Sequence, residues 1–183
     1  VAHFHYVLIG GALFGLFCGF YFWLPKMTGR MLSEKMGKVV FTLMFIGFNT
    51  TFFPMHYLGM IGQPRRTHSS NAGHGFEEWN KIATMGAFIL GIGILLGVIQ
   101  FIRSFRDKSL KPAGKNPWDS TTLEWTAEVK HIHGNWNGPI PEVHRWSYDY
   151  SKLNKDNSDY VLPGQDYIPQ HIPLQDNEDE LKH

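Results

Sequence analysis

The sequence of 183 residues is 43% hydrophobic and has a formal net charge of +1, but its charges are unevenly distributed. Residues 1–115 hold 12 Lys and Arg against 4 Asp and Glu, whereas residues 116–183 hold 5 against 12. The basic residues flank apolar runs and form no separate stripe, which argues against a nucleic-acid-binding protein. The single cysteine, Cys18, excludes a disulfide framework and a thiolate metal cluster.

Three long segments contain no Asp, Glu, Lys or Arg: residues 1–24, 39–61 and 82–102. A helix of roughly 20 apolar residues crosses the hydrocarbon core of a bilayer, and these runs are too long for the strands of a membrane barrel. They predict an all-α membrane protein. We expect three transmembrane helices of a larger helical bundle, at residues 1–25, 37–61 and 77–105. Because the sequence opens directly on membrane sequence, we expect a piece of a longer protein, either naturally split or incomplete.

Basic residues flank one end of each predicted helix. Lys26, Arg30, Lys35 and Lys38 lie between the first two helices, and five more basic residues lie between residues 103 and 115. By the positive-inside rule, both groups lie on the cytoplasmic or matrix side of the membrane. The start of the chain and the loop between the second and third helices then face the opposite side.

Two histidines, His3 and His5, lie at the start of the first predicted helix. Because a helix turns about 100° per residue, side chains two positions apart point roughly 200° apart. The two histidines therefore leave opposite faces and cannot share one metal, but they can bind two different metals with Phe4 between them. The alternative is a pair of interfacial histidines at a helix end. Since ionisable residues in a membrane are costly enough to mark function, we favour metal or haem ligation.

Arg65 and Arg66 lie in the loop GQPRRT, residues 62–67, on the side where the positive-inside rule disfavours them. Two loop arginines can simply be solvated. Alternatively, they bind anions near the membrane surface, because a guanidinium group grips a carboxylate through two parallel hydrogen bonds. Haem propionates are carboxylates, and haems held by the two histidines near this side would point them towards the loop. The two motifs therefore support each other.

Glycines recur every fourth residue at Gly11, Gly15 and Gly19, and again at Gly93 and Gly97. Small residues at this spacing let helices approach closely in lipid. We therefore predict that these positions pack against neighbouring helices.

Residues 106–183 hold seven of the ten prolines and four of the six tryptophans. Prolines interrupt long helices and central strands, and the apolar residues are too scattered for a separate core. We predict an extended, largely irregular polar tail that lies over the inner face and becomes ordered against neighbouring subunits. Its expected anchors are its tryptophans: Trp118, Trp125, Trp136 and Trp146.

Four further histidines stand outside the predicted helices. His131 and His133 repeat the spacing of the first pair, but they lie in a soluble segment, and we do not predict a metal site there. The roles of His68 and His74, in the loop before the third helix, stay open.

Three motifs resemble one family. VAHFHYV at residues 1–7, FIGFNTTFFPMHYLGMIGQPRR at 45–66 and EEWNKI at 77–82 resemble the last three helices of subunit I of haem–copper oxidases, of the cytochrome c oxidase type. The resemblance covers about residues 1–105. It continues into the tail, where NPWDSTTLEW resembles the cytoplasmic extension of bacterial subunits. The chain is thus identified as the C-terminal part of such a subunit.

The resemblance implies a role for each residue of the two motifs. His3 would be the proximal ligand of a high-spin, oxygen-binding haem and therefore the catalytic ligand. His5 would be an axial ligand of a low-spin haem that only passes electrons. Phe4 would lie between the two haems, and Arg65 and Arg66 would bind the propionates.

The resemblance also implies what the chain needs from elsewhere. The expected cofactors are two haems, haem a and haem a3, although Ile9 stands where mitochondrial relatives carry serine and leaves the haem type open. The family's copper ligands, its cross-linked tyrosine, the second ligand of the low-spin haem and the proton channels lie upstream of Val1. The chain alone would then be incomplete and inactive.

The function implied is that of the catalytic subunit of a terminal respiratory oxidase, which reduces dioxygen to water and pumps protons. The expected partners are the rest of subunit I, subunits II and III, the lipid bilayer, and cytochrome c or another electron-donor complex, alone or in a supercomplex. The expected location is the bacterial plasma membrane with a cytoplasmic tail, or the mitochondrial inner membrane with the tail in the matrix. Two alternatives remain: a quinol-oxidising enzyme on the same scaffold, and a non-catalytic membrane anchor, which would not need the histidine and arginine motifs.

Overall fold

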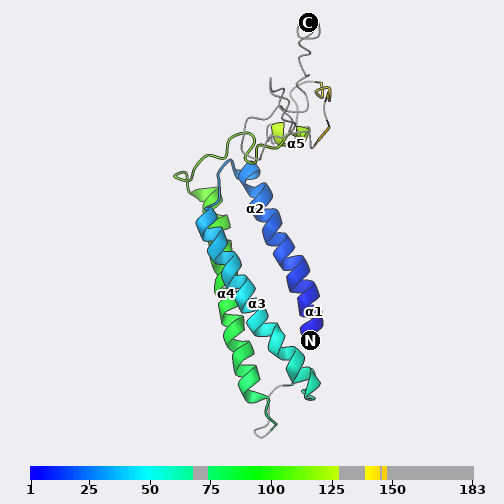
Figure 1. The fold of residues 1–183 in the computed structure, drawn as a ribbon. Coiled ribbons are helices and arrows are strands. Elements are labelled where there is room, and N and C mark those ends of the chain that lie inside the picture. Colours follow the sequence, from blue (N-terminus) through cyan, green and yellow to red (C-terminus); the bar gives the residue numbers. More distant parts are fainter. Residues whose placement is uncertain (68–73, 128–138, 145, 148–183) are drawn as a thin grey trace, which may run out of the picture. The chain divides into compact units, whose positions relative to one another are not determined.

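The computed structural model describes residues 1–67, 74–127, 139–144 and 146–147. The chain divides into two units, Val1–Leu110 and Lys111–His183. The elements of the described part are helices: α1 (Ala2–Val7), the π-helix η1 (Leu8–Leu13), α2 (Phe14–Thr28), α3 (Glu34–Met60), α4 (Glu77–Arg106) and the short α5 (Leu123–Thr126) (Figure 1). The prediction of an all-α protein is confirmed.

Three helices of the first unit are long and apolar enough to cross a membrane. They are α1, η1 and α2 taken together as Ala2–Thr28, then α3, then α4. The helices continue past the charge-free runs into basic sequence, because backbone hydrogen bonding does not stop where the hydrocarbon ends. Gly29, at φ 69°, ends α2 in the left-handed region. Ser33 caps α3, its hydroxyl accepting a hydrogen bond from the backbone nitrogen of Met36 at 3.4 Å.

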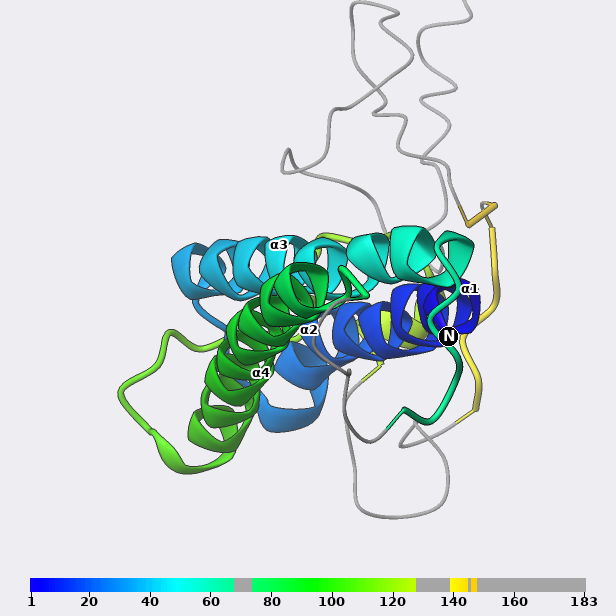
Figure 2. The ribbon, with the colours of Figure 1, turned by 90° about the horizontal axis from the view of Figure 1, so that it is seen from below.

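Helices α3 and α4 form a closely packed antiparallel pair, side by side in Figures 1 and 2. A Cβ atom at Gly47 would lie 2.4 Å from the backbone nitrogen of Leu90, and one at Gly86 would lie 2.5 Å from that of Thr51. Only glycine fits at these two positions, because the two backbones themselves are in contact. Close approach of this kind lets van der Waals packing hold helices together in lipid.

The first span contacts both helices of this pair. Its segment α1 contacts α3, and its segment α2 contacts α4. Figures 1 and 2 both show the start of α1 beside the C-terminal part of α3. The buried core is a row of large apolar side chains contributed by α2, α3 and α4: Phe17, Leu24, Val40, Met44, Phe48, Phe52, Leu90 and Phe101.

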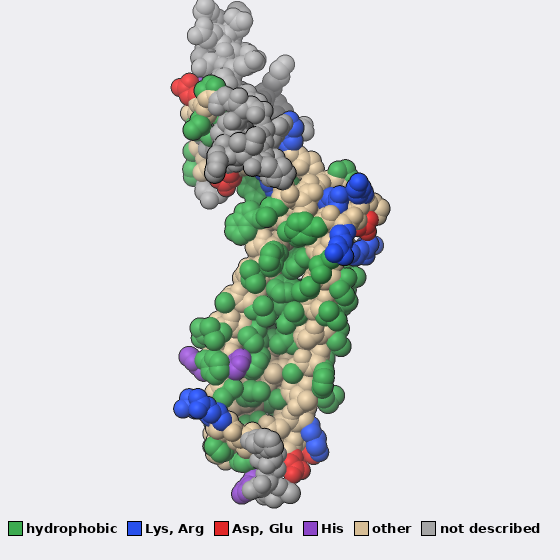
Figure 3. All heavy atoms as spheres, turned by 180° about the vertical axis from the view of Figure 1, so that it is seen from behind, with side chains coloured by type: hydrophobic (Ala, Val, Ile, Leu, Met, Phe, Trp, Pro, Cys, Tyr) green, Lys and Arg blue, Asp and Glu red, His purple; other side chains and the backbone are tan. Residues whose placement is uncertain are grey.

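The first unit therefore has two chemically different ends. We call the end formed by Val1, Met60 and Glu77 the histidine end, and the end formed by Thr28 and Arg106 the basic end. In Figure 3 hydrophobic side chains cover the middle of the helices on the face shown, and Lys and Arg side chains gather towards both ends. This distribution suits helices whose middles lie in hydrocarbon and whose ends reach the headgroups.

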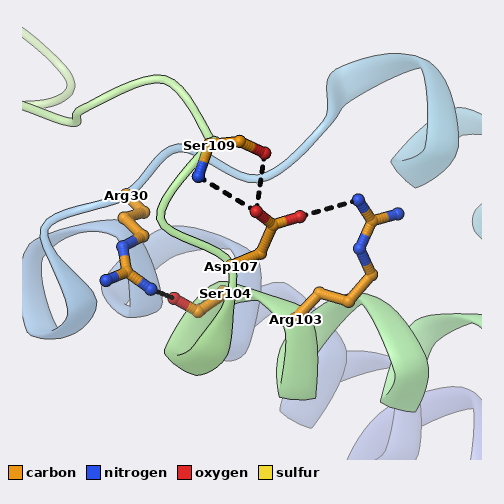
Figure 4. A network of polar contacts seen from close by, with 5 residues as sticks. All are labelled: Arg30, Arg103, Ser104, Asp107 and Ser109. Carbon is orange, nitrogen blue, oxygen red and sulfur yellow. Dashed lines mark hydrogen bonds and ion pairs between the residues drawn. The ribbon is translucent and has the colours of Figure 1, made fainter.

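Polar contacts close the basic end (Figure 4). The guanidinium group of Arg30 donates to the backbone carbonyl oxygen of Ser104 at 3.1 Å, and Ser104 is fully buried. Asp107 follows α4 and accepts hydrogen bonds from the hydroxyl of Ser109 at 2.6 Å and from Arg103 at 2.9 Å. These contacts hold the pKa of the Asp107 carboxyl well below its usual range. The carboxylate therefore stays charged where α4 ends.

The buried side chain of Gln100 links the three helices near the same end. Its Oε1 accepts a hydrogen bond from the hydroxyl of Tyr21 at 2.6 Å, and its Nε2 donates to the backbone carbonyl oxygen of Ser33 at 2.9 Å. An unpaired amide in apolar surroundings would be costly. These two hydrogen bonds satisfy the Gln100 amide and connect α2 and the residue before α3 to α4.

In the second unit, α5 carries Trp125, whose side chain is buried. Trp118 and Trp146 are 40% and 67% exposed. Trp136, His131 and His133 lie outside the described residues. The expectation that the tryptophans anchor the tail to neighbouring subunits therefore stays a prediction.

Candidate functional site at the histidine end

The imidazole of His5 is held in one tautomer by its own helix. Its Nδ1 lies 2.9 Å from the backbone carbonyl oxygen of Val1, four residues earlier. A carbonyl oxygen can only accept, so Nδ1 must carry the proton and donate it. The lone pair of Nε2 is then free for a ligand, as in metal-binding histidines whose other ring nitrogen donates to a carbonyl.

Aromatic rings fix the orientation of the His5 ring. It stacks on Phe52 of α3, with ring centroids 4.4 Å apart and planes 12° apart. The ring of Phe4 approaches it at 4.1 Å and is tilted by 36°. Because Phe52 is buried in the core, this contact orients the His5 ring against α3.

His3 lies on a different face of the same helix. It is exposed, whereas His5 is half-buried against α3. The helical rotation between the two positions leads us to expect this separation. Phe4, between them in sequence, is 47% exposed. The structure thus brings His5 against α3 and leaves His3 and Phe4 accessible on the first unit.

The loop that carries the arginines starts from a closed helix end. Gly62, at φ 93°, follows the last turn of α3, and its backbone nitrogen donates to the carbonyl oxygen of Gly59 at 3.2 Å. The nitrogen of Gln63 donates to Leu58 at 2.9 Å. These two bonds form a Schellman motif, in which a glycine supplies the left-handed turn. Pro64 follows and prevents the helix from resuming.

Arg65 and Arg66 lie next to the start of α1. Both are exposed, and together with Val1, Met55 and Gln63 they help to line a pocket of about 320 Å³. Arg66 has φ 61°, a left-handed conformation that is uncommon for a residue other than glycine. Such conformations persist where the surrounding structure enforces them. Figure 3 shows histidine side chains and, nearer the end of the helices, Lys and Arg side chains in the same region.

The start of α4 supports this loop. The side-chain amide of Gln63 donates to Oδ1 of Asn80 at 3.4 Å, and the ring of Trp79 packs against that of Tyr57 at 4.9 Å. These contacts join the end of α3 to the beginning of α4. They hold the arginine loop in place although both arginine side chains are exposed.

Sequence reasoning missed one cross-helix contact beside His5. The hydroxyl of Tyr6 donates to Oδ1 of Asn49 on α3 at 2.9 Å, and the Tyr6 ring also contacts His56 edge-on at 5.4 Å. A tyrosine next to a candidate ligand was the available signal in the sequence. Of the histidines left open, His74 stacks on Phe76, and His68 lies outside the described residues.

The donor set fits a haem better than a bare metal ion. Within the described part of the chain, no group of three or more His, Cys, Asp and Glu side chains could hold a metal. A haem already supplies four equatorial nitrogens and needs from the protein only an axial ligand and partners for its propionates. The free Nε2 of His5 and the guanidinium groups of Arg65 and Arg66 match these two needs.

Together, the fold and the site define a multi-pass α-helical membrane protein with a histidine-bearing segment at one membrane end. Residues 1–89 match the family model described as Cytochrome C and Quinol oxidase polypeptide I. The chain belongs to this family and corresponds to part of a subunit I.

Its relatives include both kinds of oxidase. The chain is 47% identical over 150 residues to the cytochrome c oxidase subunit 1 of Thermostichus vulcanus, and this match covers 82% of the chain and 26% of the relative. It is 38% identical over 174 residues to the quinol oxidase subunit 1 of Bacillus subtilis strain 168, and this match covers 94% of the chain and 26% of the relative. The chain thus spans about a quarter of the length of these curated relatives.

Proposed function

We propose that this chain is part of the catalytic subunit of a terminal respiratory oxidase and supplies ligands to two haems. The observation that carries the proposal is the His5 imidazole, whose Nδ1 donates to the Val1 carbonyl oxygen at 2.9 Å and whose Nε2 is left free. Such a ring is ready to serve as a neutral axial ligand. In the complete subunit, the assembly reduces dioxygen to water and pumps protons.

In this proposal the two histidines have separate tasks. His5 would hold a low-spin haem that passes electrons, and His3 would hold a high-spin haem that binds dioxygen. A bound haem supplies an iron centre that gains and loses single electrons. The protein provides the ligand, its tautomer and its orientation. Phe4 lies between the two histidines and keeps the segment between them apolar.

Arg65 and Arg66 bind the propionate groups through charge-assisted hydrogen bonds. Their loop lies beside the start of α1, as their shared pocket with Val1 indicates. Arginine suits this role because it keeps its charge at any physiological pH. A fixed positive charge near an iron centre stabilises the reduced state, so these residues also raise the haem potentials.

The cofactors we propose are haem a and haem a3, with copper held outside this chain. The partners are the rest of subunit I, subunits II and III and an electron donor such as cytochrome c. We place the protein in a bacterial plasma membrane. The basic end and the tail then face the cytoplasm, in accordance with the positive-inside rule, and the histidine end faces outwards.

A reduced-minus-oxidised spectrum of the purified complex, recorded with and without carbon monoxide, tests this function. We expect an a-type band with one haem that binds carbon monoxide and one that does not. Bands of o or b type would favour quinol as the donor, a reading supported by the 38% identity to a quinol oxidase subunit 1. A complex without haem would refute both oxidase functions and favour a membrane anchor.

Replacing Arg65 or Arg66 by leucine should keep both haems but lower the midpoint potential of the low-spin haem. Removal of a nearby positive charge disfavours the reduced state, and turnover should fall because electron entry becomes harder. Redox titration and oxygen uptake measure the two effects. Arg106→Leu is the matched control, since this exposed arginine lies at the opposite end. Wild-type potentials in both loop variants would contradict the role in propionate binding.

A further inference from the structure

A polar contact joins the segment that bears the histidines to the face of α3. The hydroxyl of Tyr6 donates to Oδ1 of Asn49 at 2.9 Å, and both side chains are half-buried. The two residues are 43 positions apart in sequence and lie on helices that belong to different spans. In apolar surroundings such a pair costs free energy if either partner is left unmatched.

The direction of this hydrogen bond is set by the network around it. The side-chain amide nitrogen of Asn49 donates to the backbone carbonyl oxygen of Phe45 at 2.8 Å. That contact needs an N–H group, so the Asn49 oxygen is the atom that faces α1 and can only accept. The Tyr6 hydroxyl is therefore the donor, because turning the amide over would place its oxygen against the Phe45 carbonyl oxygen and lose that bond.

The backbone after Tyr6 gives this contact its importance. Residues Leu8–Leu13 form the π-helix η1, which separates α1 from α2. A π-helical turn changes the rotation of a helix and is often found at functional sites. The packing of α2 on α4 therefore does not by itself fix how α1 is turned about its axis. The rotation of α1 must therefore be fixed by contacts between α1 itself and a neighbouring helix.

Asn49 and Phe52 provide that contact from one face of α3. They are three residues apart and so lie on the same side of the helix. Asn49 receives the Tyr6 hydroxyl, and Phe52 receives the His5 ring at 4.4 Å. The Tyr6 ring is itself packed against Phe48 at 4.6 Å. The adjacent residues His5 and Tyr6 thus both contact α3, the first by ring stacking and the second by a hydrogen bond.

We propose that Tyr6 and Asn49 are positioning residues that set the plane of the His5 imidazole and thereby the electronic properties of the low-spin haem. The proposal rests on the proposed function, because it requires His5 to be an axial ligand. Loss of the hydrogen bond lets α1 turn on the π-helical segment. His5 keeps its coordinating nitrogen, but the angle of its ring changes.

The test uses the complete oxidase complex with Tyr6→Phe, Asn49→Leu and the double variant. Phenylalanine keeps the ring and its packing, so assembly should be unaffected. We expect haem content and carbon monoxide binding to match the wild type. The EPR g-values of the low-spin haem, which depend on the ring planes of its ligands, should shift together with its midpoint potential. Because both residues act through one bond, the double variant should shift no further than the larger single variant.

Tyr21→Phe is the matched control, because this tyrosine also donates to an amide oxygen on a facing helix but lies towards the basic end. It should leave the low-spin signal unchanged. Wild-type g-values in Tyr6→Phe and Asn49→Leu would overturn the proposal. So would shifts that add up in the double variant, or an equal shift of the haem that binds carbon monoxide, since either would indicate a general packing effect. A low-spin haem that survives His5→Leu would instead refute the proposed function.

Discussion

Replacing His5 by leucine is expected to remove the low-spin haem and to keep the haem that binds carbon monoxide. Leucine fills a similar volume against Phe52 but has no nitrogen to coordinate iron. His3→Leu should have the opposite result, because His3 leaves the helix on a different face and serves the other haem. Each variant should thus lose one haem of two and, with it, essentially all oxygen reduction.

Haem content and carbon monoxide difference spectra of the two purified variants measure this result. His74→Leu is the control, since this exposed histidine stacks on Phe76 and is not one of the proposed haem ligands. It should keep both haems. If His3→Leu and His5→Leu lost the same haem and kept the other, the assignment of the histidines to two separate haems would be wrong.

Substitution of Gly47 or Gly86 by alanine should prevent normal assembly of the subunit. A Cβ at either position would lie within 2.5 Å of backbone atoms of the facing helix, which cannot move as a side chain does. The helices α3 and α4 must then separate, with a cost of about 1–3 kcal/mol or more for each added methyl group. Both the yield of haem-containing complex and its unfolding temperature should fall.

Gly91→Ala is the matched control on α4. Within the described chain, nothing lies within 4 Å of a Cβ at this position, so the same chemical change is made without the same clash. Yield and unfolding temperature of this variant should stay close to the wild type. Equal behaviour of Gly86→Ala and Gly91→Ala would show that α3 and α4 are not in backbone contact in the assembled subunit.

The sequence was sufficient to predict the class of fold, because charge-free runs of more than 20 residues have few other solutions. It did not predict where the helices meet. Gly93 and Gly97 do lie against neighbouring helices, at Met44 and Phe17, but a Cβ at Gly11 or Gly15 would contact nothing in the described chain. The closest approaches to a facing backbone are at Gly47 and Gly86, outside the four-residue repeats. Which glycines are needed depends on which helix faces meet, and this is a property of the tertiary structure.

In the candidate site, too, local features could be predicted from the sequence and contacts between helices could not. The spacing of His3 and His5 was enough to predict that their side chains point in different directions, since this follows from helical rotation alone. The stacking of His5 on Phe52 depends on the crossing of α1 and α3 and is invisible in a local pattern. The ligand and propionate roles of the predicted residues stay predictions until a cofactor-loaded complex is measured.

The packing of α3 against α4 has a consequence for how the protein is made. These helices touch through their backbones at Gly47 and Gly86, whereas the first span meets them through side chains, such as Phe17 of α2 against Gly97 and Phe48 of α3 against Gly10. The ribosome delivers the segment that bears the histidines first, before the surface that will receive it exists. The first span contacts α3 through α1 and α4 through α2, so its docking site is complete only once both later helices have been made. We therefore expect insertion of the proposed haems to follow the synthesis of α4.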